Sequence, residues 1–266
     1  MLFGFLALRI TKLLSVIAAA FAAMSGASAA IESSSREARL TQVIREVSLL
    51  ETGTQSRRAS LNEKVGERTA VRTGGDSRAE LTFVDLTITR LGANTLYGFK
   101  KSGRQVELSG GSILLRVPKD SGGATILSRA VTVGITGTTL IFEYARASGT
   151  RTTVLEGSAR VVLVGHTGEA RVLHAGQMLQ IPAGATRISQ PVEIDLAQLM
   201  KTSPLIVGFR PLPSRDSIGA AIKQQQDRGQ LNKNGAGGPP QPQNTSAPPP
   251  PGLPPGQPPG PGPGRR

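Results

Sequence analysis

Two histidines are the side chains in this chain best suited to metal binding or proton transfer. His166 and His174 stand eight residues apart, with no recognisable motif around either. Imidazole can ligate a metal or exchange a proton near neutral pH, but a metal site needs several ligands brought close together. We interpret both as ordinary histidines in or beside strands, and we expect no bound metal.

Three acidic residues lie close together in the sequence and could suggest acid catalysis: Asp76, Glu80 and Asp85. A general acid needs a desolvated pocket that raises its pKa, and the local pattern predicts no such pocket. Side chains alternate between the two faces of a strand, which places Glu80 and Thr82 opposite Leu81. The interpretation is a solvated strand face.

A short glycine-containing segment, Gly134-Ile135-Thr136-Gly137-Thr138, could be taken for a phosphate-binding loop. Such a loop requires a lysine and a following helix, and neither is predicted here. The segment is interpreted as a turn. With no catalytic grouping in the sequence, we expect neither an enzyme nor a cofactor.

Basic residues cluster at two predicted loops. Lys100, Lys101 and Arg104 surround Gly103 in a predicted hairpin loop, and Arg57-Arg58 form a smaller cluster. Loops on a rigid β scaffold are frequent binding sites, so Lys100, Lys101 and Arg104 are a candidate binding loop. The alternative is a solvated run of charges without a ligand.

The overall charge favours acidic partners. The 266 residues carry a formal charge of +13, which favours nucleic acid, anionic lipid or acidic polysaccharide as partners. Only 3% of the residues are aromatic and none is tryptophan, so base-stacking platforms are scarce and no nucleic acid is expected. The chain has no cysteine, which excludes disulfides, thiol catalysis and zinc-thiolate sites.

The N-terminal residues have the composition of a secretory signal. Arg9 and Lys12 precede a 12-residue apolar run, 13–24, and small residues follow up to Ala30. This arrangement predicts a signal peptide over residues 1–29, cleaved after Ala29 or Ala30. The alternative is an uncleaved anchor, but the run is shorter than the roughly 20 residues that span a bilayer. We predict a periplasmic or secreted protein with no transmembrane span in the mature chain.

Evenly spaced glycines divide the middle of the chain. Gly74, Gly92 and Gly111 are 18 and 19 residues apart, and Gly157 and Gly176 are again 19 apart. Alternating runs between the turns predict short strands. They lie at 38–50 as a strand pair (a helix is the competing interpretation), and at 79–83, 86–91, 95–100, 104–108, 112–117, 124–127, 130–133, 138–145, 151–156, 159–164, 170–174 and 177–181.

This pattern predicts an all-β domain over residues 38–188. So many short strands are typical of a sandwich, a β-roll or a solenoid. Similar sequence around several of the glycines suggests one repeated unit, which favours a solenoid-like coil of about 19 residues over a sandwich.

The C-terminal third is predicted to be less regular. Residues 189–231 are interpreted as a linker that contains a short helix at 194–200 and a second helix from Arg215 to about Arg228, with Ser214 as its cap. The proline-interrupted stretch 204–213 is expected to be extended, and the second helix has so thin an apolar stripe that weak docking is expected. Residues 232–266 hold most of the 19 prolines and are predicted to be a disordered tail.

The glycine-spaced stretch resembles the FecR domain family. The resemblance rests on five blocks in the same order: VGERTAVRTGGDSRAEL (65–81), RLGANT (90–95), LSGGSI (108–113), ITGT (135–138) and VLEG (154–157). It implies a β-rich, non-enzymatic domain that contacts proteins. In familiar members this domain is the periplasmic part of a membrane regulator that receives a signal from a transporter and controls a sigma factor.

The chain departs from these family members in two respects. On this interpretation it lacks their cytoplasmic anti-sigma segment and transmembrane helix, so the resemblance does not carry the whole circuit over, and a role with a sigma factor stays open. It also has Asp85-Leu86-Thr87 where the family usually has an Asp-Gly-Ser turn, which predicts a strained or differently shaped hairpin.

Two functions follow as hypotheses. The first is an exported FecR-domain protein that binds an envelope protein or senses a signal through its loops and edge strands. The second is a basic envelope protein that binds acidic polysaccharide or an anionic lipid surface. A glycan hydrolase is a third alternative, and it would require two facing carboxylates in a cleft.

Overall fold

The computed structural model describes residues 37–51, 53–100 and 104–235. The predicted signal peptide, Lys101 and the tail from residue 236 onward lie outside the described residues. The chain forms two compact units, Met1–Asp227 and Arg228–Arg266. Every described strand lies in the first unit, and so do α2, α3 and the first part of α4.

Strands dominate the described residues, as the sequence predicts. They are β1 (Glu37–Ile44), β2 (Val47–Glu51), β3 (Arg57–Arg58), β4 (Lys64–Gly66), β5 (Thr69–Thr73), β6 (Arg78–Phe83), β7 (Ile88–Leu91), β8 (Leu96–Lys100), β9 (Gln105–Arg116), β10 (Ala124–Leu127), β11 (Val131–Ile135), β12 (Thr139–Ala145), β13 (Gly149–Glu156), β14 (Ser158–Leu163), β15 (His166–His174), β16 (Gln177–Ile181) and β17 (Val192–Glu193). The helices are η1 (Lys119–Ser121), α2 (Leu196–Thr202), α3 (Pro204–Val207) and α4 (Arg215–Gly235).

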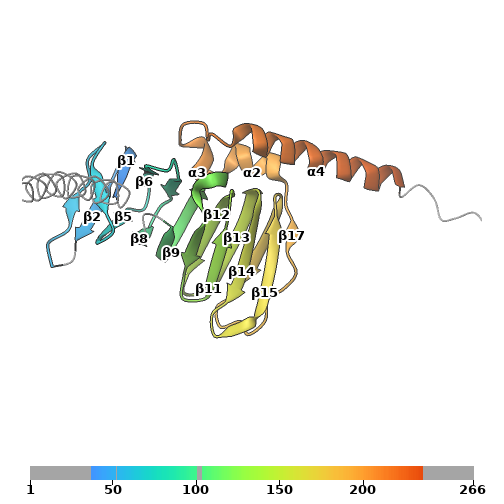
Figure 1. The fold of residues 1–266 in the computed structure, drawn as a ribbon, viewed down its shortest axis with the longest axis horizontal. Coiled ribbons are helices and arrows are strands. Elements are labelled where there is room, and N and C mark those ends of the chain that lie inside the picture. The colour runs from blue at the N-terminus through green and yellow to red at the C-terminus, as the bar shows by residue number, and fades with distance from the viewer. Residues whose placement is uncertain (1–36, 52, 101–103, 236–266) are drawn as a thin grey trace, which may run out of the picture. The chain divides into compact units, whose positions relative to one another are not determined.

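The strands form two layers that share one strand (Figure 1). Sheet A has the order β4-β1-β6-β7-β9-β12-β13-β16-β17. Sheet B has the order β3-β2-β5-β8-β9-β10-β11-β14-β15. The first half of β9 pairs in sheet B and its second half pairs in sheet A. Two apolar inner faces then enclose the main core.

The pairing corrects the preference for a solenoid. Neighbouring strands in both sheets are antiparallel, and β9 with β10 is the one parallel pair among the described strands. Coils of a parallel β-helix would instead stack their strands in parallel. Of the architectures considered, the two-layer arrangement agrees with the observed register.

The repeated unit is a hairpin, and the glycines mark its ends. Between successive glycines a hairpin forms within one sheet: β6–β7 in sheet A, β8–β9 in sheet B, β12–β13 in sheet A and β14–β15 in sheet B. The chain changes sheets between these hairpins. The glycines at the changes of sheet are Gly74, Gly92, Gly111, Gly137, Gly157 and Gly176.

Gly111 illustrates why glycine is needed where the chain changes sheets. Its φ is +98°, a backbone conformation that costs residues with a Cβ energy. A Cβ placed there would lie 2.5 Å from the Cα of Thr95. The bend in the middle of β9 therefore depends on a residue without a side chain.

Residues after β17 pack on the outer face of sheet A. A second apolar cluster joins Leu114, Ile141 and Leu155 of that sheet to Leu196, Leu205, Leu212 and Ile218. Figure 1 shows α2, α3 and the start of α4 gathered beside these strands. Two expectations are corrected: part of the stretch 204–213 forms α3, and the second helix docks firmly, because Ile218 is fully buried.

The far end of α4 also differs from the expectation. The helix continues to Gly235, so residues 232–235 of the predicted tail are helical. Near its middle, Gln225 ties α4 to the rest of the first unit. Its Nε2 donates to the Ile194 carbonyl at 2.5 Å, and its Oε1 accepts from the Leu196 amide at 3.3 Å.

The β6–β7 turn has the strained shape that its sequence predicts. Leu86 has a φ of +63° and its side chain is 66% exposed. The turn is held by a hydrogen bond from the Thr87 amide to the Asp85 carboxylate at 2.9 Å. Leucine therefore occupies a left-handed position without any burial to offset the strain.

Replacing Leu86 with glycine is expected to stabilise the domain by about 0.5–1 kcal/mol. Relief of left-handed strain contributes about 1–2 kcal/mol, and the extra freedom of glycine in the unfolded chain offsets part of it. Urea unfolding followed by circular dichroism measures the change. The control is Val84→Gly, an exposed neighbour outside the left-handed region, which should destabilise. A lower unfolding midpoint for Leu86→Gly would contradict the argument.

Candidate functional site

One row of side chains crosses the outer face of sheet A. Strand register places the following residues side by side: Gln42, Glu80, Arg90, Leu114, Ile141, Thr153, Met178 and Val192. The second apolar cluster covers Leu114 and Ile141. This row supports the C-terminal helices that form one wall of the candidate site.

A buried ion pair lies in this row. Arg90 Nε donates to Glu80 Oε2 at 2.8 Å, and the two side chains are 1% and 9% exposed. The Thr41 hydroxyl donates to the other Glu80 oxygen at 2.8 Å. Interpreting Glu80 as part of a solvated face is therefore wrong. It does lie on the outer face of its strand, but later residues of the chain cover that face.

Arg90 also fixes the covering segment. It donates to the carbonyls of Leu205 at 3.1 Å and Arg210 at 2.5 Å. Its guanidinium carbon lies 4.7 Å from the ring centroid of Phe209, a favourable cation–π arrangement. Burial lowers the pKa of Arg90, while its hydrogen bond with Glu80 acts in the opposite direction. The pair therefore holds α3 and the loop after it against sheet A.

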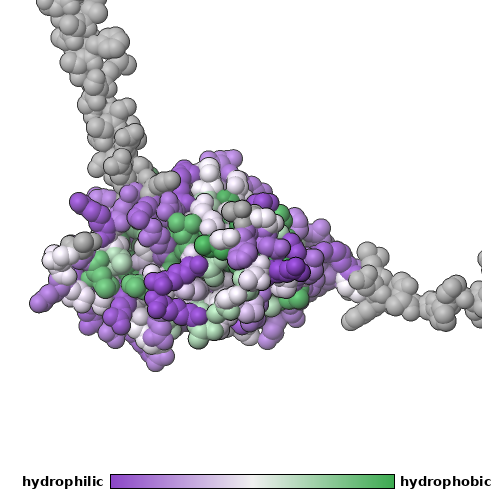
Figure 2. All heavy atoms as spheres, turned by 90° about the horizontal axis from the view of Figure 1, so that it is seen from below, coloured by the Kyte–Doolittle hydropathy of each residue, from purple (hydrophilic) through white to green (hydrophobic). Residues whose placement is uncertain are grey.

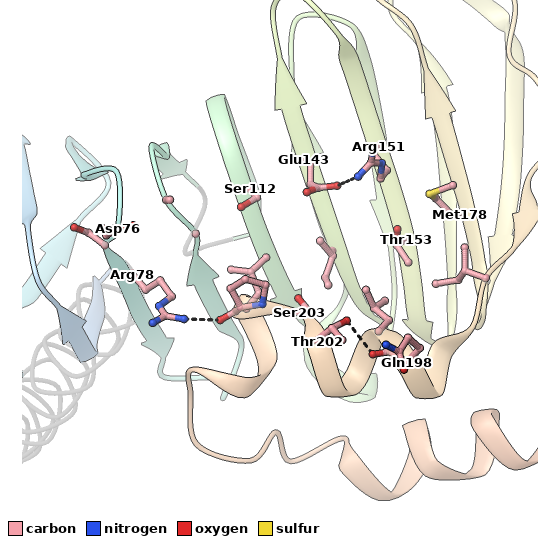
Figure 3. A pocket seen from close by; sticks show the side chains of 18 of the residues that line it. Asp76, Arg78, Ser112, Glu143, Arg151, Thr153, Met178, Gln198, Thr202 and Ser203 are labelled. Atoms are coloured by element: carbon pink, nitrogen blue, oxygen red, sulfur yellow. Dashed lines mark hydrogen bonds and ion pairs between the residues drawn. The ribbon is translucent and has the colours of Figure 1, made fainter.

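Beside this covered row lies an open groove of about 910 Å³. Figure 3 shows it between the strands of sheet A and helix α2. Glycine and small side chains form part of its lining: Gly75, Gly92, Ala93 and Ser112.

Two charged pairs line the groove. Glu143 and Arg151 face each other across β12 and β13, with an N–O distance of 3.2 Å. Arg45 and Asp76 pair at 2.8 Å. Both pairs are substantially exposed, so each contributes little to stability. Their charges remain accessible to a ligand.

The wall of the groove combines apolar and polar side chains. Leu199 and Leu205 come from α2 and α3, while Met178 comes from β16. Gln198 and Thr202 of α2 add polar groups (Figure 3). An amphipathic groove lined by charged pairs suits an extended peptide segment, whereas no described group of three or more acidic, histidine or cysteine side chains could hold a metal.

The sequence-predicted basic loop does not line this groove. Lys100 forms an ion pair with Glu107 at 2.7 Å on sheet B. Arg104 donates to the Gly123 carbonyl at 3.3 Å and lines a separate recess. Lys101 lies outside the described residues. Arg57 is engaged by Glu63 and Glu51.

Other sequence candidates are dispersed. His166 and His174 are at opposite ends of β15. They pair with Leu163 and Ser158 of β14, which are about 17 Å apart at the usual rise of a strand, so the two histidines cannot share a metal. Among the acids, Asp76 is at the groove, Glu80 is buried, and Asp85 holds its own turn. Residues 134–138 contain the end of β11 and the following turn, as interpreted.

Exposed apolar side chains offer no comparable alternative. The large ones are Leu61, Val84, Leu86, Leu96, Val164, Val172, Val192 and Val207, spread over several strands, turns and α3. On the face seen in Figure 2, hydrophobic residues occur in separate groups among hydrophilic ones. The groove is therefore the best candidate for binding on sheet A.

Sequence reasoning missed the groove. Its residues come from segments between Arg45 and Leu205, and no local pattern brings them together. One signal was available, because Glu80 and Arg90 are opposite charges at outward positions of two predicted adjacent strands. Such a cross-strand pair would indicate which face carries a polar contact.

Comparison with known proteins confirms the family resemblance for the centre of the chain. Residues 69–160 match the family model described as FecR protein. This part of the chain, from β5 into β14, is therefore similar to a FecR domain. No curated protein matches the chain.

Two solved structures from Parabacteroides distasonis ATCC 8503, each titled a "putative anti-sigma factor", have similar folds. The first is 17% identical, with a TM-score of 0.44, and the match covers 49% of this chain and 62% of the other. The second is 15% identical, with a TM-score of 0.43, and covers 50% and 64%. In both cases the match spans less than two thirds of the other chain.

Within the described ranges, no helix combines the length and apolar character needed to cross a bilayer.

Proposed function

We propose that this chain is an exported, non-enzymatic FecR-domain protein that binds an envelope protein as part of signalling. The FecR match supports a signalling-related module. The single observation that carries the binding role is the groove between sheet A and helices α2 and α3.

The dimensions of the groove fit a peptide segment. Its floor extends from Arg78 on β6 across β7, β9, β12 and β13 to Met178 on β16. Neighbouring strands lie about 4.8 Å apart, so five intervals span about 24 Å, the length of about seven extended residues. A segment that carries both charged and apolar side chains would match the lining.

Site-specific crosslinking in intact cells tests this proposal. A photo-reactive amino acid at Gln198, an exposed groove residue of α2, should capture one distinct protein. The same amino acid at Arg58, exposed on β3 of sheet B, is the matched control and should not capture it. Equal capture from both positions, or none from Gln198, would count against a protein partner in the groove.

Charge reversal in the lining of the groove should weaken that capture. Glu143→Arg is expected to reduce the crosslinked product about tenfold, since a misplaced charge at an interface costs on the order of 1–2 kcal/mol. The double variant Glu143→Arg, Arg151→Glu restores an ion pair in the opposite orientation. It should match the wild type in thermal stability, and its capture should stay about tenfold below that of the wild type. Capture at the wild-type level by the double variant would show that binding does not depend on which of the two positions carries the positive charge.

Export is part of the same proposal. Cleavage after Ala29 or Ala30 would give a mature protein that begins at Ala30 or Ile31. Mass spectrometry of the protein from the periplasm or medium measures this terminus. An intact Met1 on exported protein would contradict the cleavage.

A further inference from the structure

The outer face of sheet B holds a second recess, distinct from the groove. Strand register places Gln105, Thr125, Gly134, Arg160 and Val172 in one row across β9, β10, β11, β14 and β15. Gly134 has no side chain, and no heavy atom lies within 4 Å of the position that its Cβ would occupy. The gap between Thr125 and Arg160 is part of a recess of about 660 Å³.

Two guanidinium groups border this recess. Arg160 is exposed, and its side chain makes no ion pair with any residue of the described ranges. Arg104 is also without an acidic partner there, although it donates to the Gly123 carbonyl. None of the described lining residues is acidic. Both positive charges are therefore available to an anionic ligand.

The loop beneath Arg104 is closely fitted. Gly122 and Gly123 have φ values of +81° and +80°. A Cβ on Gly122 would lie 2.6 Å from Arg104 Nη1, and one on Gly123 would lie 2.6 Å from the Ile135 carbonyl oxygen. The Thr125 amide also donates to the Arg104 carbonyl at 2.7 Å. The Arg104 guanidinium therefore lies directly over the Gly122–Gly123 turn, at the border of the recess.

Hydroxyl groups complete the lining. Thr125, Thr136 and Ser158 each contribute a side chain to the recess. No described lining residue is aromatic, so the recess offers no surface on which a nucleobase could stack. Guanidinium groups bind carboxylates with two parallel hydrogen bonds, while hydroxyls exchange hydrogen bonds with polar ligands.

We propose that this recess binds an acidic saccharide, with a sugar carboxylate between Arg104 and Arg160. The sugar hydroxyls would contact Thr125 and Ser158, and the gap at Gly134 would accommodate the ring. The chain has a net charge of +13, and the mature protein keeps all of it except Arg9 and Lys12 of the predicted signal peptide. This positive charge would attract a polyanionic chain toward the site. The concave, hydroxyl-lined shape favours a saccharide over a flat lipid surface.

Calorimetric titration of the mature protein with an oligomer of galacturonic acid tests the proposal. Arg160→Gln and Arg104→Gln should each weaken binding about tenfold, the effect of losing one charge-assisted hydrogen-bonded contact. Arg72→Gln is the matched control, because it removes an exposed charge from β5 of the same sheet; its affinity should change less than twofold. Equal losses in all three variants would overturn the site, since only net charge would then matter.

A steric variant tests the shape of the recess independently of its charges. Gly134→Leu should fill the gap and abolish binding, while Gly98→Leu fills an equally open position on β8 and should bind normally. Circular dichroism checks that both variants are folded. Unchanged binding by Gly134→Leu would overturn the proposal.

The ligand class is tested with two further probes. A neutral galactose oligomer should not bind, and vesicles containing phosphatidylglycerol should bind more weakly than the acidic oligomer, without dependence on Gly134. The saccharide proposal would be overturned if the protein bound the vesicles more tightly than the acidic oligomer and Gly134→Leu abolished this binding. The recess would then be assigned to lipid phosphate.

Discussion

Glu80→Gln is expected to lower the free energy of unfolding by about 3–5 kcal/mol, because removing one partner leaves the other charge buried and unpaired. Arg90 is 1% exposed and has Glu80 as its acidic partner among the described residues. Urea unfolding of the mature protein measures the loss. The effect should include the covering segment, because Arg90 also binds the carbonyls of Leu205 and Arg210.

An exposed ion pair provides the control. Asp76→Asn removes the partner of Arg45, and these two side chains are 82% and 65% exposed. Its cost should stay below about 1 kcal/mol. Replacing both buried partners, as Glu80→Leu with Arg90→Met, should recover much of the stability. A loss for Glu80→Gln no larger than that for Asp76→Asn would contradict the importance of the buried pair.

Limited trypsin digestion gives a local measurement of the same variant. Lys201 lies at the end of α2, directly before the segment that Arg90 holds. In Glu80→Gln, cleavage after Lys201 should become faster than in the wild type, at a denaturant concentration where both proteins remain folded. An unchanged digestion pattern would mean that the segment does not depend on the ion pair.

Gly157→Ala is expected to destabilise the domain by about 3 kcal/mol, the second large effect. Its φ is +78°, which costs a residue with a Cβ about 1–2 kcal/mol. The new Cβ would also lie 2.6 Å from the Gly137 carbonyl oxygen, so two places where the chain changes sheets would have to move apart. The unfolding midpoint measures the change.

A second glycine separates strain from collision. Gly165 also has a φ of +78°, but nothing lies within 4 Å of its Cβ position. Gly165→Ala should therefore show only the cost of strain, about 1–2 kcal/mol. Equal losses for the two variants would show that the close approach of Gly157 to Gly137 is unimportant.

The sequence predicted the strands well because alternation is a local property. β10 and β16 agree with the predicted bounds 124–127 and 177–181, and the pair β1–β2 replaces the competing helix. The glycine spacing also identified a repeated unit. It could not distinguish a hairpin from a coil, since the direction in which strands pair depends on contacts far apart along the chain.

The groove and the buried ion pair could not be predicted from local sequence patterns, because both depend on contacts between distant parts of the chain. Alternation correctly placed Glu80 on the outer face of β6. Whether solvent reaches that face depends on residues about 125 positions later in the chain. The helix that follows them, α4, has only a thin apolar stripe. Ile218 docks because Leu114, Ile141 and Leu155 supply the opposing surface, and nothing near Ile218 in the sequence indicates this.

Strand β9 has a consequence for how the domain unfolds. Its 12 residues are the one described segment that pairs in both sheets, so each half of the molecule relies on the same backbone. Separation of β9 from β12 would divide sheet A into two parts, and separation of β9 from β8 would divide sheet B in the same way. We therefore expect a single cooperative transition, in which the amide hydrogens of β9 exchange with solvent among the slowest in the chain.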